Sequence, residues 1–239
     1  MQIWIDAGLS KYNLPSFKAS GLSIPKSQKR VAILGQVSGD ASLKYANPDH
    51  YNFFDLILAA KEENPNAEII YRPHPEEGKK KNNKTKKILK KLEGICEVAD
   101  PSIDLVDFLS NVDHVYTISS LSGLEALLRG KAVTVFGTPF YAGWGLTDDR
   151  VLTLGRKRNL SKENLFSAVY LLYPQYLVEP DGSKTKGFLT SAFRILAERK
   201  QHEISIIQRP HLENVESVST QRSFQYLLNL FLRSSKTDE

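Results

Sequence analysis

The chain has 239 residues, of which 41% are hydrophobic and 25% charged, so it can fill one large domain or two small ones, and its composition is not that of a disordered or fibrous protein. Its single cysteine, Cys96, excludes a disulfide within the chain and a cysteine-rich metal site, which fits a reducing cytosol. No apolar run approaches the ~20 residues that span a bilayer, and the first residues lack the pattern of a signal peptide, so we expect a cytoplasmic protein.

Basic residues outnumber acidic ones by 32 to 27, and part of this excess lies in the segment GKKKNNKTKKILKKLEG at 78–94. A lysine cluster of this kind can attract nucleic acid, an anionic membrane face or an anionic sugar donor. A solvated loop and helix face is the simpler interpretation.

The predicted elements follow residues 1–29, which we interpret as a helix end and a linker. From about residue 30 to 172, β-branched runs alternate with amphipathic patterns, as in βα units around a parallel sheet. The predicted strands are 30–35, 67–73, 96–100, 114–119 and 131–137. The predicted helices are 50–64, 83–93, 102–112, 122–130 and 161–172. The sequence therefore predicts an α/β fold, with a Rossmann-like parallel sheet flanked by helices over 30–182 and a helical extension with a frayed end over 183–239.

Polar or glycine-rich loops follow four of these strands. In open parallel sheets, ligands bind at the carboxyl ends of the strands, where loops run into helix N-termini. The four loops are GQVSGDAS at 35–42, RPHPEE at 72–77, SSLSG at 119–123 and GTPFYAGWG at 137–145. Because they share one edge of the sheet, we expect them to form a single site.

The first loop places Asp40 after a strand and a glycine-bearing turn. A carboxylate in this position is a candidate nucleophile or base, and the amide of Gln36 can fix it. The alternative is an Asp or Ser that caps the next helix or turn.

The second loop holds His74 between Pro73 and Pro75, in a stiff turn that restricts the histidine backbone. Its imidazole can donate a hydrogen bond to a phosphate or carry a proton near neutral pH. Arg72 offers a second contact for an anion. The alternatives are a polar cap on a loop and an ordinary surface arginine.

The third loop places Ser119, Ser120 and Ser122 before a helix, where exposed N–H groups and the helix dipole favour an anion. Ser122 and Glu125 also have the spacing of a capping box, which would explain both without a ligand. Ser119 and Ser120 are not needed for that cap, so they favour a functional role.

The fourth loop contains Tyr141 and Trp144, which can flank a sugar or base or form a hydrophobic plug. Asp148 and Asp149 can form a carboxylate pair, although a solvated turn is the simpler interpretation. The remaining histidines have no partner at metal-ligand spacing, so we predict no metal site. These histidines are His50, His114, His202 and His211.

Five segments, in the same order, resemble the capsule polysaccharide biosynthesis family, and specifically its KpsC-type retaining β-Kdo glycosyltransferases. The segments are GLSKYN, GQVSGDAS, RPHP, the block at 116–147 and LYPQYL, within residues 8 to 180. The positions that match the family's motifs are Gln36, Asp40, Ser42, His74, Pro75, Ser119 and Ser120.

This resemblance implies that the sheet is the C-terminal domain of a GT-B-like glycosyltransferase that transfers Kdo from CMP-β-Kdo, with retention, to a poly-Kdo glycolipid linker. It implies Asp40 as the nucleophile, and His74 with the serines of the third loop as ligands of the CMP phosphate. It also implies a donor site that needs no metal cofactor, because a histidine and a helix N-terminus can stabilise the leaving phosphate. The donor-site residues it implies are Gln36, Ser42, Arg72, His74, Pro75, Ser119, Ser120, Ser122, Gly123 and Glu125, with Tyr141 and Trp144 lining the substrate pocket.

Members of this family carry a large N-terminal half, with acceptor contacts and a further catalytic carboxylate, before the segment that matches GLSKYN. Here Met1 stands only seven residues before Gly8, so we expect the donor-binding half of one module. The expected partners are a CMP-sugar, an anionic glycolipid, and a separate N-terminal half or other capsule-assembly proteins, but no nucleic acid. The lysine cluster would suit the acceptor or the inner face of the inner membrane. The alternative function is an inactive nucleotide-sugar-binding or scaffold subunit of a capsule assembly or export complex.

Overall fold

The computed structural model describes residues 1–11, 28–37, 39–76, 92, 94–174, 196–198 and 200–201. The chain divides into two compact units. One comprises residues 17–162 and contains the sheet, and the other combines residues 1–16 with 163–239. Within the described ranges, no helix is long and apolar enough to cross a membrane.

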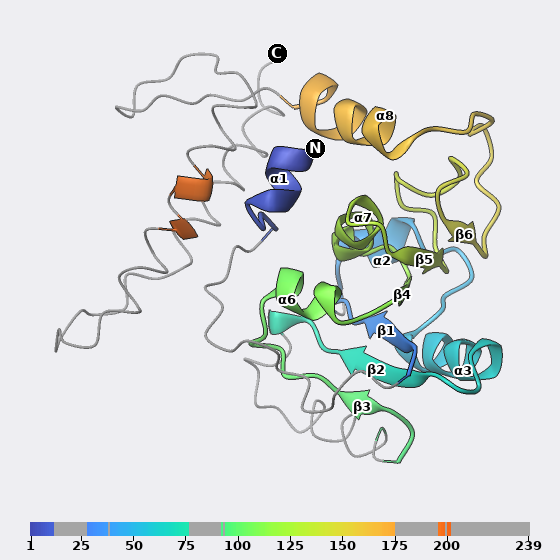
Figure 1. The fold of residues 1–239 in the computed structure, drawn as a ribbon. Helices are drawn as coiled ribbons and strands as arrows, with labels where there is room; N and C mark the ends of the chain where they lie inside the picture. The colour runs from blue at the N-terminus through green and yellow to red at the C-terminus, as the bar shows by residue number, and fades with distance from the viewer. Residues whose placement is uncertain are drawn as a thin grey trace, which may run out of the picture. The chain divides into compact units, whose positions relative to one another are not determined.

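The larger unit is built on a six-stranded sheet in which every neighbouring pair is parallel (Figure 1). Its strands are β1 (Arg30–Leu34), β2 (Glu68–Arg72), β3 (Glu97–Val98), β4 (His114–Thr117), β5 (Ala132–Val135) and β6 (Asp148–Asp149). The spatial order is β3-β2-β1-β4-β5-β6, which is the strand order of the Rossmann fold. The chain therefore winds outward in both directions from the boundary between β1 and β4.

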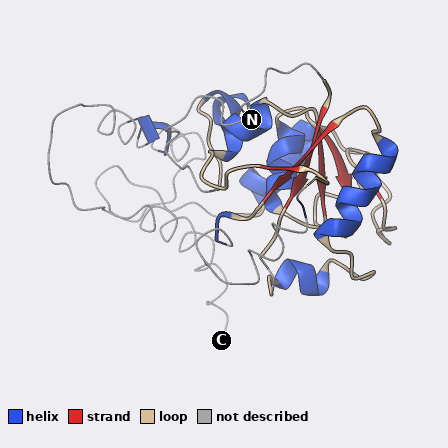
Figure 2. Cartoon of the chain, turned by 90° about the horizontal axis from the view of Figure 1, so that it is seen from below, coloured by secondary structure: helices blue, strands red, loops and turns tan. Residues whose placement is uncertain are grey.

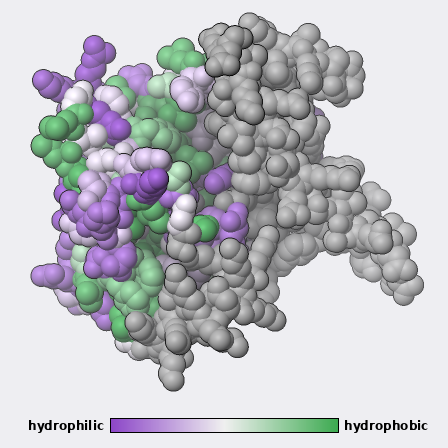
Figure 3. Space-filling model, turned by 180° about the vertical axis from the view of Figure 1, so that it is seen from behind, coloured by the Kyte–Doolittle hydropathy of each residue, from purple (hydrophilic) through white to green (hydrophobic). Residues whose placement is uncertain are grey.

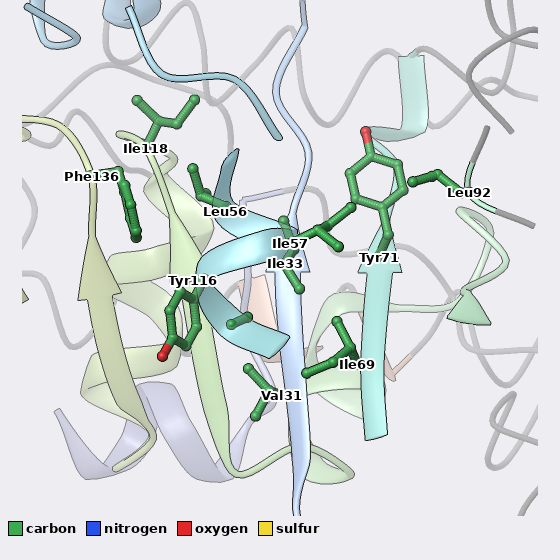
Figure 4. Packing of buried hydrophobic residues seen from close by; sticks show 11 residues of the cluster. Val31, Ile33, Leu56, Ile57, Ile69, Tyr71, Leu92, Tyr116, Ile118 and Phe136 are labelled. Atoms are coloured by element: carbon green, nitrogen blue, oxygen red, sulfur yellow. The ribbon is translucent and has the colours of Figure 1, made fainter. Parts of the chain in front are cut away.

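Helices cover both faces of this sheet (Figure 2). They are α2 (Ala41–Tyr45), α3 (Phe53–Glu63), α6 (Leu105–Ser110) and α7 (Leu121–Leu128). Side chains alternate between the two faces along each strand. On one face, α3 packs against a buried cluster drawn from β1, β2 and β4 (Figure 4). Asn52 caps α3 by accepting from the Phe54 N–H, while Asp55 accepts from the Asn52 N–H, so the start of this helix is fixed locally.

The smaller unit contains α1 (Gln2–Asp6), α8 (Lys162–Ser167), which begins at the boundary, and a π-helical turn, Ala168–Leu172. Trp4 is 4% exposed, and its ring centroid lies 6.3 Å from that of Phe166 and 6.0 Å from that of Tyr170. Aromatic packing thus joins the first helix to residues far along the sequence.

The predicted α/β class is confirmed, and each predicted strand contains a strand of the structure. Two elements were not predicted, namely α2 and β6, whereas α1 agrees with the helix end expected in the first residues. Asp148 and Asp149 form β6, so the predicted solvated turn was wrong. The predicted helix at 83–93 and most of the extension at 183–239 lie outside the described residues.

Candidate active site

The candidate site lies at the carboxyl ends of β1 and β4, the position at which open α/β sheets bind ligands because the strand order reverses there. Gln36, just beyond β1, spans this boundary. Its Nε2 donates to the hydroxyls of Ser42, at 3.2 Å, and Ser119, at 3.1 Å. Its Oε1 accepts from the Ser119 N–H at 2.9 Å. One side chain therefore ties the first predicted loop to the third.

Asp40 is the N-cap of α2, and its side chain is exposed. Its Oδ1 accepts from the N–H of Ser42 at 2.9 Å and from the Ser42 hydroxyl at 3.0 Å. Among the residues that the structure describes, none donates a hydrogen bond to Oδ2. The predicted alternative, a helix cap, is thus realised, but it occupies only one carboxylate oxygen and leaves the other open to a ligand.

His74 stands next to this loop because the ends of β1 and β2 approach closely. The N–H of Gly35 donates to the Arg72 carbonyl at 2.9 Å. A Cβ atom at position 35 would lie 2.7 Å from the Tyr71 hydroxyl and 3.2 Å from the His74 nitrogen, so only glycine fits. Nδ1 of His74 accepts from the N–H of Glu76 at 3.2 Å. In the neutral ring the proton is therefore on Nε2, which makes Nε2 a donor. Pro75 is half-buried and, with Glu76, has a helical backbone.

Arg72 serves the packing of the sheet, in contrast to the predicted anion contact. It is 6% exposed, its Nη2 donates to the Ile103 carbonyl at 2.6 Å, and its guanidinium lies 5.3 Å from the ring centroid of Phe108. The alternation of side chains along β2 places Arg72 on the face of the sheet that α6 covers.

The N-cap of α7 is Ser120, whose hydroxyl oxygen accepts from the Ser122 N–H at 3.2 Å. The predicted capping box of Ser122 and Glu125 is therefore not formed, because the helix begins at Leu121. Glu125 is 1% exposed, and its carboxylate lies 3.5 Å from Nη1 of Arg129. This burial does not support the implied contact with a ribose.

Tyr141 holds the start of α7 in place. It has no exposed surface, and its hydroxyl donates to the Ser120 carbonyl at 2.6 Å. A Cβ atom at Gly123 would collide with that hydroxyl and would lie 2.8 Å from Cγ2 of Thr117. Burial raises the pKa of Tyr141 far above its usual value, so the hydroxyl stays neutral and donates. The plug that we considered as an alternative fits better than a side chain lining an open pocket.

Trp144 is half-buried, and its Nε1 donates to the Phe140 carbonyl at 2.7 Å. Arg156 packs its guanidinium 5.6 Å from the Trp144 ring centroid. Asp149 holds the same loop by accepting from the Gly143 N–H at 2.8 Å. Neither Arg156 nor this role of Asp149 has a local signal in the sequence, because both side chains act across a loop. Within the described part of the chain, no group of three His, Cys, Asp or Glu side chains could hold a metal ion.

The sequence also matches a known protein family. The model of the family described as "Capsule polysaccharide biosynthesis protein" matches residues 10–177. The chain belongs to this family. The family prediction and the Rossmann-like fold are thereby confirmed.

Relatives in the capsule polysaccharide family are substantially longer than this chain. The lipopolysaccharide-processing protein LpsZ of Rhizobium meliloti is 45% identical over 181 residues, which are 75% of this chain and 40% of LpsZ. The capsule polysaccharide modification protein LipA of Neisseria meningitidis serogroup B is 40% identical over 196 residues, which are 80% of this chain and 27% of LipA. The chain therefore spans less than half of either relative.

Two solved structures have a fold similar to that of this chain. The Thermosulfurimonas dismutans KpsC β-Kdo 2,4 transferase has a TM-score of 0.67 and 33% identity, over 82% of this chain and 60% of the other. The KpsC β-Kdo 2,7 transferase from the same organism has a TM-score of 0.61 and 33% identity, over 83% of this chain and 62% of the other. Together with the family match, these similarities support a glycosyltransferase-like role in capsule polysaccharide biosynthesis.

Proposed function

We propose that this chain is the donor-binding domain of a retaining β-Kdo glycosyltransferase that takes CMP-β-Kdo as donor and a poly-Kdo glycolipid as acceptor. One observation carries the proposal most directly. Gln36 joins the Asp40–Ser42 turn to Ser119 across the boundary between β1 and β4, so a carboxylate and a helix N-terminus come together at a ligand-binding edge.

In the first proposed step, Oδ2 of Asp40 attacks the anomeric carbon of Kdo. The bond from that carbon to the phosphate oxygen breaks, and its electron pair leaves with CMP. Negative charge grows on the departing phosphate, where the Nε2–H of His74 and the N–H groups that begin α7 can stabilise it. No step of this proposal uses a metal ion.

In the second proposed step, the acceptor hydroxyl attacks the same carbon and releases Asp40. Two inversions give net retention. The hydroxyl proton needs a base, and we assign none of the site residues to that role. The proposal therefore includes a further protein part, a separate N-terminal half or another capsule-assembly protein, that supplies acceptor contacts and the base.

Mass spectrometry of the full chain after incubation with CMP-Kdo, with and without a Kdo-terminated acceptor, tests the proposal. We expect a Kdo adduct on the peptide that contains Asp40, and its absence in Asp40→Ala. Binding of CMP with neither adduct nor product would instead favour an inactive nucleotide-sugar-binding subunit. Unchanged CMP affinity in His74→Ala would contradict the assignment of His74 to the phosphate.

A further inference from the structure

Two large apolar side chains project from the loop that follows β6. Leu152 is 82% exposed and Leu154 is 86% exposed, which is more than Leu58 on α3 at 63%. On the face seen in Figure 3, hydrophobic residues lie among hydrophilic ones, so exposure alone does not single out this loop. We call residues 150–159 the leucine loop.

The charge of the leucine loop sets it apart. Its sequence, RVLTLGRKRN, contains four basic residues and no acidic one. The first, Arg150, is paired with Glu63 at 2.6 Å and with Asp148 at 2.8 Å. Arg156 is turned inward, where its Nη1 donates to the carbonyls of Pro139, at 2.5 Å, and Ala142, at 2.7 Å. Lys157 and Arg158 are exposed and stand three and four residues after Leu154.

The base of the leucine loop is fastened to the scaffold. At the start of the loop, the N–H of Arg150 donates to the Val135 carbonyl at 2.9 Å. Between the two leucines, a Cβ atom at Gly143 would lie 2.9 Å from Cβ of Thr153. The N–H of Leu160 donates to the Trp144 carbonyl at 2.9 Å. Because both ends are held, the leucines and cations at the tip are presented together.

We propose that the leucine loop docks onto a membrane surface that contains anionic phospholipids. Leu152 and Leu154 enter the interface between headgroups and acyl chains, while Lys157 and Arg158 lie against the headgroup phosphates. Apolar burial and attraction to anionic lipid are each weak alone, and stable attachment needs both.

The position of the leucine loop connects this surface to the candidate site. The loop leaves the sheet at the carboxyl end of β6, and every strand of the sheet runs parallel, so the loops around Gln36 emerge at the same edge. Docking would bring that edge toward the membrane, where the glycolipid acceptor of the proposed function would be presented; only this link rests on the proposed function.

Sedimentation of the full chain with vesicles tests the docking directly. We expect binding to vesicles of phosphatidylcholine with phosphatidylglycerol, and little binding to phosphatidylcholine alone. Removing both cations, in Lys157→Gln with Arg158→Gln, should lower the partition coefficient by about fivefold for each cation. Leu152→Ser with Leu154→Ser should lower it by about tenfold or more.

Leu58→Ser is the matched control, because it removes another exposed leucine outside the leucine loop, and its partition coefficient should stay unchanged. An equal loss in this control, or no binding of the wild type to the anionic vesicles, would overturn the proposal. Self-association of the wild type that disappears in the leucine variant, without vesicle binding, would assign the surface to a protein contact and also overturn it. CMP affinity measured on the same variants should not change, so failure of the docking and failure of the donor site are distinguishable.

Discussion

Two Asp-x-Ser segments follow parallel strands of the sheet, Asp40 to Ser42 after β1 and Asp100 to Ser102 after β3. In each, Oδ1 of the aspartate accepts from the N–H and the hydroxyl of the serine. These distances are 2.9 and 3.0 Å in the first segment and 2.8 and 2.7 Å in the second. The two aspartates are exposed, so the local structures are nearly equivalent.

The two segments differ in what surrounds them. Ser42 also accepts from Gln36, which reaches Ser119 beyond β4. β1 and β4 are the central pair at which the strand order reverses, whereas β3 is the edge strand of the sheet. A capped aspartate therefore becomes a candidate nucleophile through its place in the topology and through one long-range amide, and not through its local geometry.

The same substitution at Asp40 and at Asp100 should have very different effects on Kdo transfer, and this is the largest difference that we expect. Asn and Asp are equally good N-caps, so Asp40→Asn keeps the turn but removes the nucleophile. We expect Kdo transfer, assayed with whatever further protein part the reaction needs, to fall by about a thousandfold or more. The free energy of unfolding should change by less than about 0.5 kcal/mol.

Asp100→Asn is the matched control for this loss. It changes an aspartate with the same hydrogen bonds to its serine, and transfer should remain at the wild-type rate. Comparable losses of transfer in the two variants, measured by product formation from CMP-Kdo, would mean that the topology does not distinguish the segments.

Gln36→Ala should make the first segment resemble the second. It removes the bonds to Ser42 and Ser119 and leaves the Ser119 N–H without its acceptor, in a residue that is only 6% exposed. An unsatisfied buried group of this kind costs about 1–3 kcal/mol of unfolding free energy. We also expect CMP affinity to fall by about tenfold, measured by calorimetry, because Ser119 at the start of α7 is no longer held.

Gln2→Ala provides the control, since Gln2 bonds only to Asp6 on an exposed turn of α1. It should alter neither quantity. If Gln36→Ala bound CMP as tightly as this control, the amide bridge would not organise the donor site.

How far the sequence predicts these features depends on the distance over which each contact acts. The hydrophobic periodicity predicted the strands, and therefore the loops at their carboxyl ends, because this pattern depends only on residues that are close together in the sequence. The sequence analysis assigned the cap of this helix to Ser122, whereas Ser120 caps α7, because either serine satisfies the local rules for a helix cap. The sequence could not predict the contacts of Tyr141 and Arg72, because their partners, the Ser120 and Ile103 carbonyls, are set only by the folded chain.

The sequence also did not predict that the two Asp-x-Ser segments have nearly the same local structure. The sequence prediction singled out Asp40 because it lies in a polar, glycine-bearing loop after the first predicted strand, and the family resemblance then supported it, whereas Asp100 was not considered. The Gln36 bridge spans 83 residues, and its role as a link between two loops has no local signal.

The smallest predicted effect concerns the scaffold beneath both segments, through His114 at the beginning of β4. Its Nε2 lies 2.9 Å from the Thr134 hydroxyl. Burial, followed by the positive charge of Lys29, lowers the pKa of His114, and this outweighs the opposing effect of Asp148 and Glu63. The histidine of the unfolded chain has an ordinary pKa of about 6.5. As the pH falls, the unfolded chain therefore binds a proton at a higher pH than the folded chain does.

The contribution of His114 to stability is accordingly full above about pH 7 and is lost as the pH falls through about 6.5 toward the folded-state pKa. Urea unfolding at a series of pH values should show this decline in the wild type and a smaller one in His114→Gln. Asp40→Asn and Asp100→Asn should show the same pH dependence as the wild type, because both variants keep His114. A wild-type decline that persists unchanged in His114→Gln would assign the proton uptake to another group and would show that the end of β4 opposite Ser119 is not pH-sensitive.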